Sequence, residues 1–326
     1  MGLSGKMSAS SLKRMHLFAL KVVVIPVDPY LPIYATANLA TLENPPNGPM
    51  ARFTSDRDAS TKANVLEHQL VRMYGALGLV WSALNDVTKP SEGSIRRSDR
   101  NANAQRPDYN INRTFSSISL GSESSIESQH SGTSYTEGTS PKDMHLEECS
   151  VHLLTCAMRL ILHNAQPENA AMAIEFRARE RLTLDMGTFE FVAIDDGGLR
   201  CRTTLGKVSE NFVAGIEAKR DVKTFNNSPI IYDDALAQMA YEVILVRANS
   251  VADANVNSVV IIHIAGHHVC FLEFRINAAY LTQLRRGRTP TEFLRVSVTR
   301  MFNLERNYGR TPFAENMARL IAFSLV

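Results

Sequence analysis

The residues in this chain whose types and spacing best suit chemistry are Glu217 and Lys219, which stand two positions apart at the end of an apolar run. The run, residues 212–216, predicts a buried strand. Because side chains in a strand alternate between its two faces, we expect Glu217 and Lys219 on the same face. A carboxylate beside an ammonium group can bind a hard cation and orient a water molecule. Metal-assisted hydrolysis of a phosphodiester needs at least this apparatus.

The plain alternative for a Glu-x-Lys tripeptide is an exposed pair at a strand end, which is worth under about 1 kcal/mol. The surroundings of the pair distinguish the two interpretations. Catalysis needs the strand inside the core and a second acid close to the first, whereas an exposed pair needs neither.

Hydrophobic periodicity and turn residues divide the surrounding sequence into helices and strands. The predicted elements are a helix at 145–164, strands at 173–184 and 188–194, a short strand near 199–204, the Glu-x-Lys strand, a helix at 232–248, and hairpin strands at 258–264 and 269–276. The final stretch, 291–326, is expected to be helical. This order predicts an α/β (α+β) fold, with a mixed central sheet flanked by helices.

Composition divides the chain into three parts. Residues 1–85 are interpreted as an N-terminal extension with one or more helices, because apolar residues recur at helical spacing from Val65 to Leu84. Residues 86–143 are rich in Ser, Asn, Gly and Thr. Such a segment cannot bury enough apolar surface to offset its ordering entropy, so we predict a disordered linker there. Residues 144–326 are expected to form the compact domain.

The motif Ile216-Glu217-Ala218-Lys219, the order of the elements, and Gln238 in the following helix together resemble the PD-(D/E)xK nuclease-like superfamily, especially its divergent fungal members. The resemblance covers about residues 144–275. It implies a restriction-endonuclease-like core and a metal-dependent nuclease that hydrolyses phosphodiester bonds of DNA or RNA.

The resemblance also implies roles for individual residues. Glu217 would be a metal ligand, with Mg²⁺ or Mn²⁺ as the cofactor, and Lys219 would orient or deprotonate the attacking water. Gln238 stands where family members often carry a Gln. Glu147 or Glu148 would match the acid of the first helix.

The second strand departs from the family pattern, which has an Asp there, usually preceded by Pro or Gly. In the matching stretch, 187–194, Glu190 occupies the Asp position, and Asp185 is the alternative acid, reaching from the turn. Glu is one methylene longer than Asp, and Mg²⁺ requires strict octahedral geometry. Two further hypotheses therefore stand beside the active nuclease. One is a catalytically degenerate nuclease-fold domain that acts as a binding or scaffolding module, and the other is an unrelated structural or assembly protein.

Composition restricts the remaining possibilities. The net charge of +2 and the pI near 8.3 are not those of a general polycation, so nucleic acid would bind at a local patch. The four scattered cysteines suit a reduced, intracellular protein of the nucleus or cytoplasm. The sequence has no apolar run of about 18 residues or more, so it predicts no membrane-spanning helix. The basic stretch 1–27 is compatible with an organelle transit peptide, and the alternative is the first element of the fold.

Three histidines, His263, His267 and His268, lie around a predicted hairpin turn. Histidine is a common ligand of transition metals, but no acid or cysteine completes a recognisable spacing here. We therefore expect these histidines to be solvated rather than to bind a metal.

Overall fold

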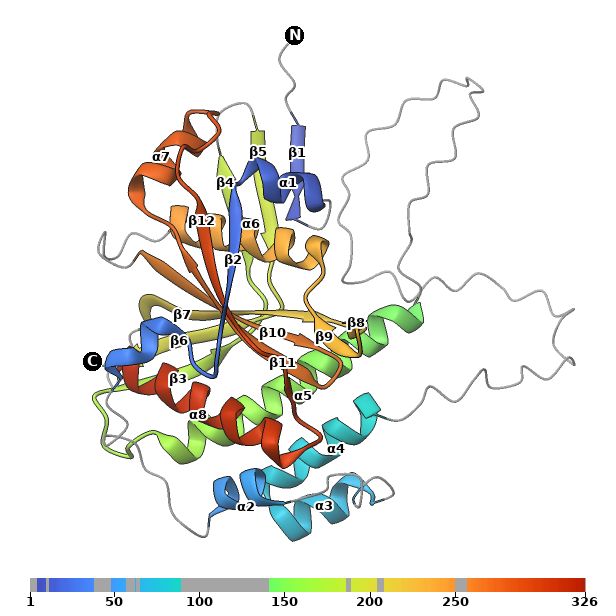
Figure 1. Ribbon diagram of the computed structural model, residues 1–326. Helices are drawn as coiled ribbons and strands as arrows, with labels where there is room; N and C mark the ends of the chain where they lie inside the picture. Colours follow the sequence, from blue (N-terminus) through green and yellow to red (C-terminus); the bar gives the residue numbers. More distant parts are fainter. Residues whose placement is uncertain are drawn as a thin grey trace, which may run out of the picture. The chain divides into compact units, whose positions relative to one another are not determined.

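The computed structural model describes residues 5–9, 12–37, 48–56, 62, 65–88, 141–185, 189–203, 208–249 and 257–325. These residues form an α/β fold in which helices flank a mixed β-sheet, so the fold class expected from the sequence is confirmed (Figure 1). Most of the predicted linker, residues 89–140, lies outside the described residues. The ends of the predicted linker, residues 86–88 and 141–143, belong to helices.

The elements follow one another in three groups. The first comprises β1 (Gly5–Ser8), α1 (Arg14–Ala19), β2 (Val22–Val27), the 3₁₀ helix η2 (Pro32–Thr36), α2 (Pro49–Ser55), α3 (Glu67–Tyr74) and α4 (Ala76–Thr88). The second comprises α5 (Pro141–Ala165), β3 (Met172–Arg177), β4 (Arg181–Asp185), β5 (Phe189–Ile194), β6 (Gly198–Thr203) and β7 (Val208–Lys219). The third comprises β8 (Lys223–Phe225), β9 (Ser228–Ile230), α6 (Asp233–Asn249), β10 (Ser258–Ala265), β11 (His268–Arg275), α7 (Ala278–Arg285), β12 (Leu294–Thr299), β13 (Phe302–Asn303) and α8 (Asn307–Ser324).

The strand that ends in Glu217 and Lys219, β7, lies inside the larger sheet. The described strands of this sheet run in the order β2-β12-β11-β10-β7-β6-β3, with β13 beside β11. β6 pairs antiparallel with β7, and β10 pairs parallel with it, in a register that places His263 opposite Glu217. Helix α6 connects the two parallel strands, as such a crossover requires. The prediction of an apolar core strand that ends in Glu-x-Lys is confirmed.

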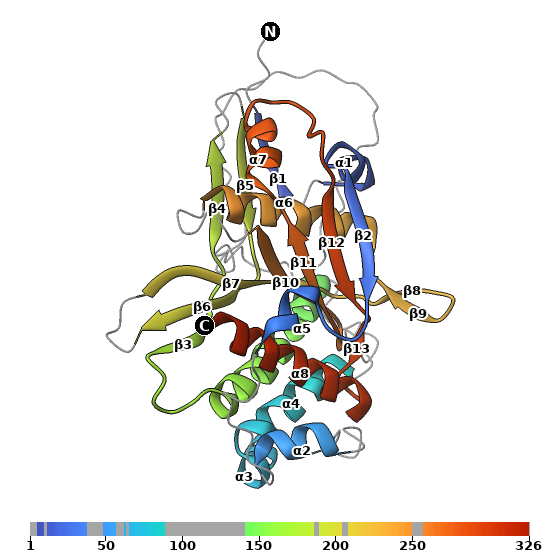
Figure 2. The ribbon, with the colours of Figure 1, turned by 60° about the vertical axis from the view of Figure 1, so that its left-hand side comes forward.

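Different helices cover the two faces of β7. Ile216 and Ala218 belong to the hydrophobic core that α5 closes, whereas α6 closes a second core over β10 and β11. Because side chains alternate along a strand, Glu217 and Lys219 face the α6 side of the sheet. Both helices lie against this sheet in Figures 1 and 2.

Strands β4 and β5 belong to a second sheet, in the order β1-β5-β4, and not to the sheet that contains β7. Glu190, which matches the family's second-strand acid in sequence, therefore lies on a strand that does not border the Glu-x-Lys strand. The strand next to β7 is β6, which begins at Gly198.

The segment between β3 and β6, which carries β4 and β5, leaves the larger sheet. Polar contacts hold the two ends of this segment together. The N–H of Glu180 donates to Asp195 Oδ1 at 3.0 Å, and the N–H of Asp195 donates to the Glu180 carbonyl at 3.2 Å. The buried Arg177 side chain pairs with Asp195 as well. These bonds join the end of β3 to the start of β6, so the residues between them form an insertion.

The N-terminal part of the chain packs into the same fold as residues 141–325. β2 pairs parallel with β12, and α4 packs against α5. Arg310 of α8, which is fully buried, donates to the carbonyls of Phe53 and Leu304. The expectation of a purely helical stretch at 291–326 is wrong, because β12 and β13 precede α8.

Candidate functional site

Glu217 and Lys219 form a buried ion pair at the end of β7. Lys219 Nζ lies 2.5 Å from Glu217 Oε1, and the side chains are 17% and 1% exposed, respectively. An exposed surface pair is therefore excluded. The alternation of β7 places both groups under α6, where water is scarce.

Helix α6 extends this pair into a chain of four polar side chains. Lys219 Nζ donates to Gln238 Oε1 at 3.0 Å, and Gln238 Nε2 donates to Glu242 Oε1 at 3.0 Å. Gln238 and Glu242 lie four residues apart, which is one turn of the helix. Glu242 is 1% exposed, and sequence reasoning did not single it out. Its position inside an apolar helix, four residues after Gln238, was the available signal.

Asp196 brings a third carboxylate to the end of β7. Its Oδ2 accepts the N–H of Ala218 at 2.9 Å, and its own N–H donates to the Ile216 carbonyl at 3.2 Å. Arg179 lies 3.0 Å from its Oδ1. Asp196 thus stands beside the Glu-x-Lys tripeptide, at the start of the neighbouring strand β6.

Two glycines allow the turn that carries Asp196 to approach β7 this closely. Gly197 has φ 123°, a conformation that other residues rarely adopt. A Cβ on Gly198 would lie 2.4 Å from the Ala214 carbonyl oxygen, which is closer than any side chain tolerates. The residue types of Asp195-Asp196-Gly197-Gly198 indicate only a turn, and sequence reasoning did not single out the acid within it.

The first-helix acid in this cluster is Glu147. It is half-buried on α5 and interacts electrostatically with Lys219 and Asp196. Its neighbour Glu148 is exposed. Of the two acids that the resemblance implied for this helix, Glu147 is the one that belongs to the site.

The two acids expected from the second strand are not part of this arrangement of strands. Asp185 and Glu190 are opposite each other in the β4–β5 hairpin, within the smaller sheet. Their side chains lie outside the described residues. The excursion between β3 and β6 explains the error, because its strands alternate like those of the larger sheet. Asp196 occupies the place beside β7 that the sequence assigned to Glu190.

Burial shifts the protonation of the carboxyl groups. It raises the pKa of Glu217 to about 8, although the charge of Lys219 opposes the shift. Burial, together with the nearby Glu217, raises the pKa of Glu242 well above its usual value. Burial raises the pKa of Asp196 and of Glu147 as well. Burial alone would lower the pKa of Lys219, but the contact with Glu217 outweighs it and keeps the ammonium charged.

The cluster has an excess of negative groups. Glu147, Asp196, Glu217 and Glu242 are four carboxyl groups, and Lys219 and Arg179 are two cations, so full ionisation would leave a charge of 2 − 4 = −2. The Oε2 atoms of Glu217 and Glu242 are buried and have no hydrogen-bond partner within the described part of the chain.

A hard divalent cation fits this set of oxygen donors, because Mg²⁺ and Mn²⁺ prefer carboxylate ligands. In the structure, Lys219 Nζ forms an ion pair with Glu217 Oε1. Among the described residues, no group of three or more His, Cys, Asp or Glu side chains is already arranged to hold a metal ion. The chemistry of the donors thus suits a metal, and the observed ion pair takes up one of them.

His263 supports the site from β10. It is 1% exposed, contrary to the expectation of a solvated histidine, and its Nδ1 lies 3.0 Å from the carbonyl of Glu217. Burial lowers its pKa to about 4, so the ring is neutral at pH 7 and donates through Nδ1. This bond fixes the backbone beside Glu217. The rings of His267 and His268 stack 4.4 Å apart at the hairpin turn.

No protein-family model matches the chain, and no curated protein matches it in sequence. Within the described residues, none of the helices is long and apolar enough to cross a membrane.

Proposed function

We propose that this protein is a metal-dependent nuclease that hydrolyses phosphodiester bonds of DNA or RNA. One observation carries the proposal: Asp196 and the Glu217–Lys219 pair meet at the junction of β6 and β7, where Asp196 accepts the Ala218 N–H. The sequence resemblance implied two acids and a lysine, with Glu190 or Asp185 as the second acid, and we assign that role to Asp196.

Each residue has a role that its contacts support. Asp196 and Glu217 would hold Mg²⁺ or Mn²⁺, with Glu147 as a further carboxylate from α5. The metal, when bound, would act as a Lewis acid on the phosphate and lower the pKa of a water. Lys219 would hold the attacking water and stabilise the charge that develops on the phosphate oxygens. Gln238 holds the Lys219 ammonium in position through the bond to its Oε1.

A catalytically degenerate nuclease-fold module is the second candidate, and the burial of the acids favours it. Glu217 and Glu242 are each 1% exposed, and Lys219 neutralises Glu217 directly. In such a module the polar cluster would stabilise one conformation of the domain, and the protein would bind a partner without hydrolysing it.

Metal binding and cleavage, measured separately on the full chain, test the proposal. Calorimetric titration with Mn²⁺ should show binding that Glu217→Gln weakens. Single- and double-stranded DNA and RNA should be cleaved in Mg²⁺ or Mn²⁺ and left intact in EDTA. Lys219→Ala should abolish cleavage with the fold retained. The control is Arg202→Ala, which removes an exposed ion pair with Glu175 on the far part of β6 and should change nothing.

The outcomes separate the two candidates. Cleavage that depends on metal and on Lys219 supports the nuclease. Metal binding without cleavage of any of the four substrates supports the degenerate module. If neither metal binding nor cleavage occurs, the polar cluster is purely structural, and the nuclease proposal fails.

A further inference from the structure

The edge strand of the larger sheet, β2, exposes an apolar run. Val23, Val24 and Ile25 are 39%, 46% and 41% exposed, so side chains on both faces of the strand meet solvent. Such a continuous apolar run is typical of a strand that is covered on both sides. Proteins usually protect an exposed edge with charges, because an open apolar edge pairs with other chains.

Among the residues that the structure describes, no strand pairs with the outer edge of β2, whose backbone therefore offers a defined set of hydrogen-bonding groups. The N–H of Leu294 on β12 donates to the Lys21 carbonyl, which shows that residue 21 directs its backbone toward β12. Because the direction alternates along a strand, residues 23, 25 and 27 also face β12. Val22, Val24 and Pro26 therefore direct their backbone groups outward. Pro26 has no N–H, so it sits at a position where β12 needs none.

The apolar surface continues on both sides of β2. Seven of the fourteen large hydrophobic residues that are exposed in the described part of the chain belong to this edge and its surroundings: Met15, Phe18, Val23, Val24, Ile25, Ile230 and Phe293. Met15 and Phe18 lie on α1, which leads into β2, and they are 71% and 72% exposed. A concentration of this kind marks an interaction surface rather than scattered exposure.

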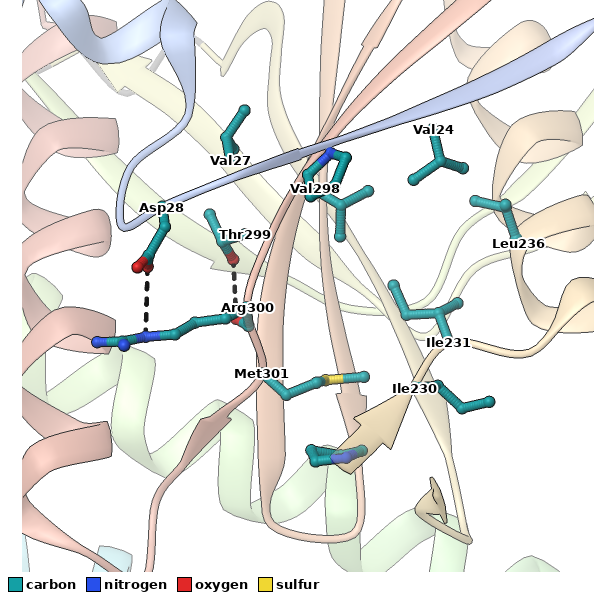
Figure 3. Close-up of a pocket in the computed structure, with 12 residues that line it drawn as sticks. Val24, Val27, Asp28, Ile230, Ile231, Leu236, Val298, Thr299, Arg300 and Met301 are labelled. Atoms are coloured by element: carbon teal, nitrogen blue, oxygen red, sulfur yellow. Dashed lines mark hydrogen bonds and ion pairs between the residues drawn. The ribbon is translucent and has the colours of Figure 1, made fainter. Parts of the chain in front are cut away.

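A pocket of about 460 Å³ adjoins the edge (Figure 3). Val24 and Val298 line it from the sheet, Ile231 lines it from the segment before α6, and Leu236 lines it from α6 itself. The exposed ion pair of Asp28 and Arg300 lies at its polar end. The pocket therefore offers apolar walls beside the free backbone groups of β2.

We propose that a second copy of this chain docks on the edge, with the two β2 strands antiparallel about a twofold axis at Val24. The Val24 N–H of each copy then donates to the Val24 carbonyl of the other. In the same register, Val22 lies opposite the partner's Pro26, so its N–H donates to the Pro26 carbonyl. Both outward N–H groups of β2 find acceptors, and the missing N–H of Pro26 leaves only one carbonyl, that of Val22, without a donor.

The charges that flank β2 fit the antiparallel arrangement. Lys21 precedes the strand and Asp28 follows it, and 58% of the Asp28 side chain is exposed. In the proposed register residue 21 lies opposite residue 27, so Lys21 of each copy approaches the partner's Asp28. A parallel arrangement would instead place like charges together. Opposite charges across paired strands are favourable, and like charges are unfavourable.

The same register brings apolar side chains to the pocket. Val22, Val24 and Pro26 share one face of β2, and paired residues of neighbouring strands share a face as well. Val22 of the second copy therefore lies beside Pro26, at the rim of the pocket. The twofold axis makes this contact occur twice, and the two larger sheets become one continuous sheet.

Sedimentation of the full chain between about 1 and 100 µM tests the proposal, since weak homodimers associate in this range. The wild-type protein should approach twice its 36.2 kDa mass as its concentration rises. Val24→Pro removes an N–H that β12 does not use, in a strand that already holds Pro26. It should raise the dissociation constant by about a hundredfold, because two hydrogen bonds of the interface are lost with the Val24 side chain.

Three further variants control for misfolding and for a general loss of exposed apolar surface. Leu79→Ser removes an apolar residue on α4 that is 39% exposed, and it should leave the dimer unchanged. Lys21→Asp should weaken the dimer, and adding Asp28→Lys should restore it, because the double variant exchanges the two charges. Restoration by the double variant requires the antiparallel register.

Hydrogen exchange supplies a readout at single residues. The Val22 and Val24 amides should exchange rapidly in dilute protein and become protected as the dimer forms. A protein that stays monomeric up to about 100 µM would overturn the proposal. So would a dimer that Val24→Pro leaves intact. Protection of these amides only by an extended peptide from another protein would show that the edge serves a different partner.

Discussion

The end of β7 and the edge strand β2 belong to one sheet, and they break the usual rule of burial in opposite directions. At the end of β7, Glu217 is 1% exposed, although ionisable groups are rarely buried so fully. On β2, Val24 is 46% exposed, although the strand has the sequence of a core strand. One region buries charge, and the other exposes apolar surface.

The folding of a single chain explains neither the buried charge at the end of β7 nor the exposed apolar surface of β2. Burying Glu217 and Glu242 opposes folding unless something compensates their charge, and Lys219 compensates only part of it. Exposing Val23 to Ile25 adds nothing to the stability of one chain and favours association. A cation and a nucleic acid are the missing partners that we propose for the first region, and a second copy is the one that we propose for the second.

Removal of Lys219 should have the largest effect on the buried region. In Lys219→Ala the proposed hydrolysis should fall by about a thousandfold or more, because the variant lacks the group that holds the water and stabilises the developing charge. Single-turnover cleavage in Mn²⁺ measures the loss. Lys219→Arg, which keeps the charge but changes its shape, should recover only part of the activity. Full activity in Lys219→Ala would remove the lysine from the mechanism.

The free energy of unfolding should depend steeply on pH because of Glu217. Its pKa rises from 4.5 to about 8 on folding, so the folded chain binds the proton more tightly than the unfolded chain. The resulting stability is complete below pH 4.5 and is lost as the pH rises to about 8.

The pKa shift of His263 has the opposite sign to that of Glu217, and it affects stability in a different pH range. Its pKa falls from 6.5 to about 4, so its contribution to stability is lost as the pH falls through that range. The change in stability due to His263 therefore fades as the pH rises above 6.5, whereas that due to Glu217 continues up to about pH 8. Urea unfolding between pH 6.5 and 8 should show stability that falls with pH, and Glu217→Gln should flatten the slope. An unchanged slope in Glu217→Gln would mean that the carboxylate is already fully ionised in the folded protein.

The next smaller effect on the proposed hydrolysis compares substitutions at Asp196 and at Glu190. Asp196→Asn should lower the proposed hydrolysis by about a hundredfold and weaken Mn²⁺ binding, because it removes a ligand charge beside Ala218. Glu190→Ala should leave both unchanged, because β5 belongs to the other sheet. Cleavage rates and calorimetry on the two variants provide the measurement. If Glu190→Ala abolished activity and Asp196→Asn did not, the strand assignment from the sequence would be the better guide to the site.

The predictions that the structure bears out rest on the periodicity of neighbouring residues in the sequence. The alternation along β7 placed Glu217 and Lys219 on one face, and the helical period at 232–248 predicted the helix that carries Gln238. These features depend on neighbours in the sequence. The strand β12 was also visible as alternation at Leu294, Val296 and Val298, but it was absorbed into a predicted helix.

The errors arose where distant contacts decide the fold. The salt bridge of Arg177 with Asp195 joins the two ends of the segment that holds β4 and β5, and the turn residues around Asp195 do not reveal this partner. Without that contact, β5 has a better alternating pattern than the short strand β6. The sequence therefore assigned the second acid to Glu190. The role of Asp196 depends on its position at the base of a closed insertion, which no local pattern encodes.

The smallest effect should come from the exposed region, and it tests whether β2 serves the single chain. Val24→Thr exchanges a methyl group for a hydroxyl at a position that is 46% exposed, so the free energy of unfolding should change by less than about 0.5 kcal/mol. Val296 lies directly opposite Val24 on β12 and is fully buried. Val296→Thr should therefore destabilise the protein by about 1–3 kcal/mol, because its hydroxyl has to leave water. Urea unfolding of both variants at a concentration low enough to keep the chain monomeric makes the comparison. If the two substitutions were equally destabilising, Val24 would support the fold of one chain, and its apolar character would need no second copy to explain it.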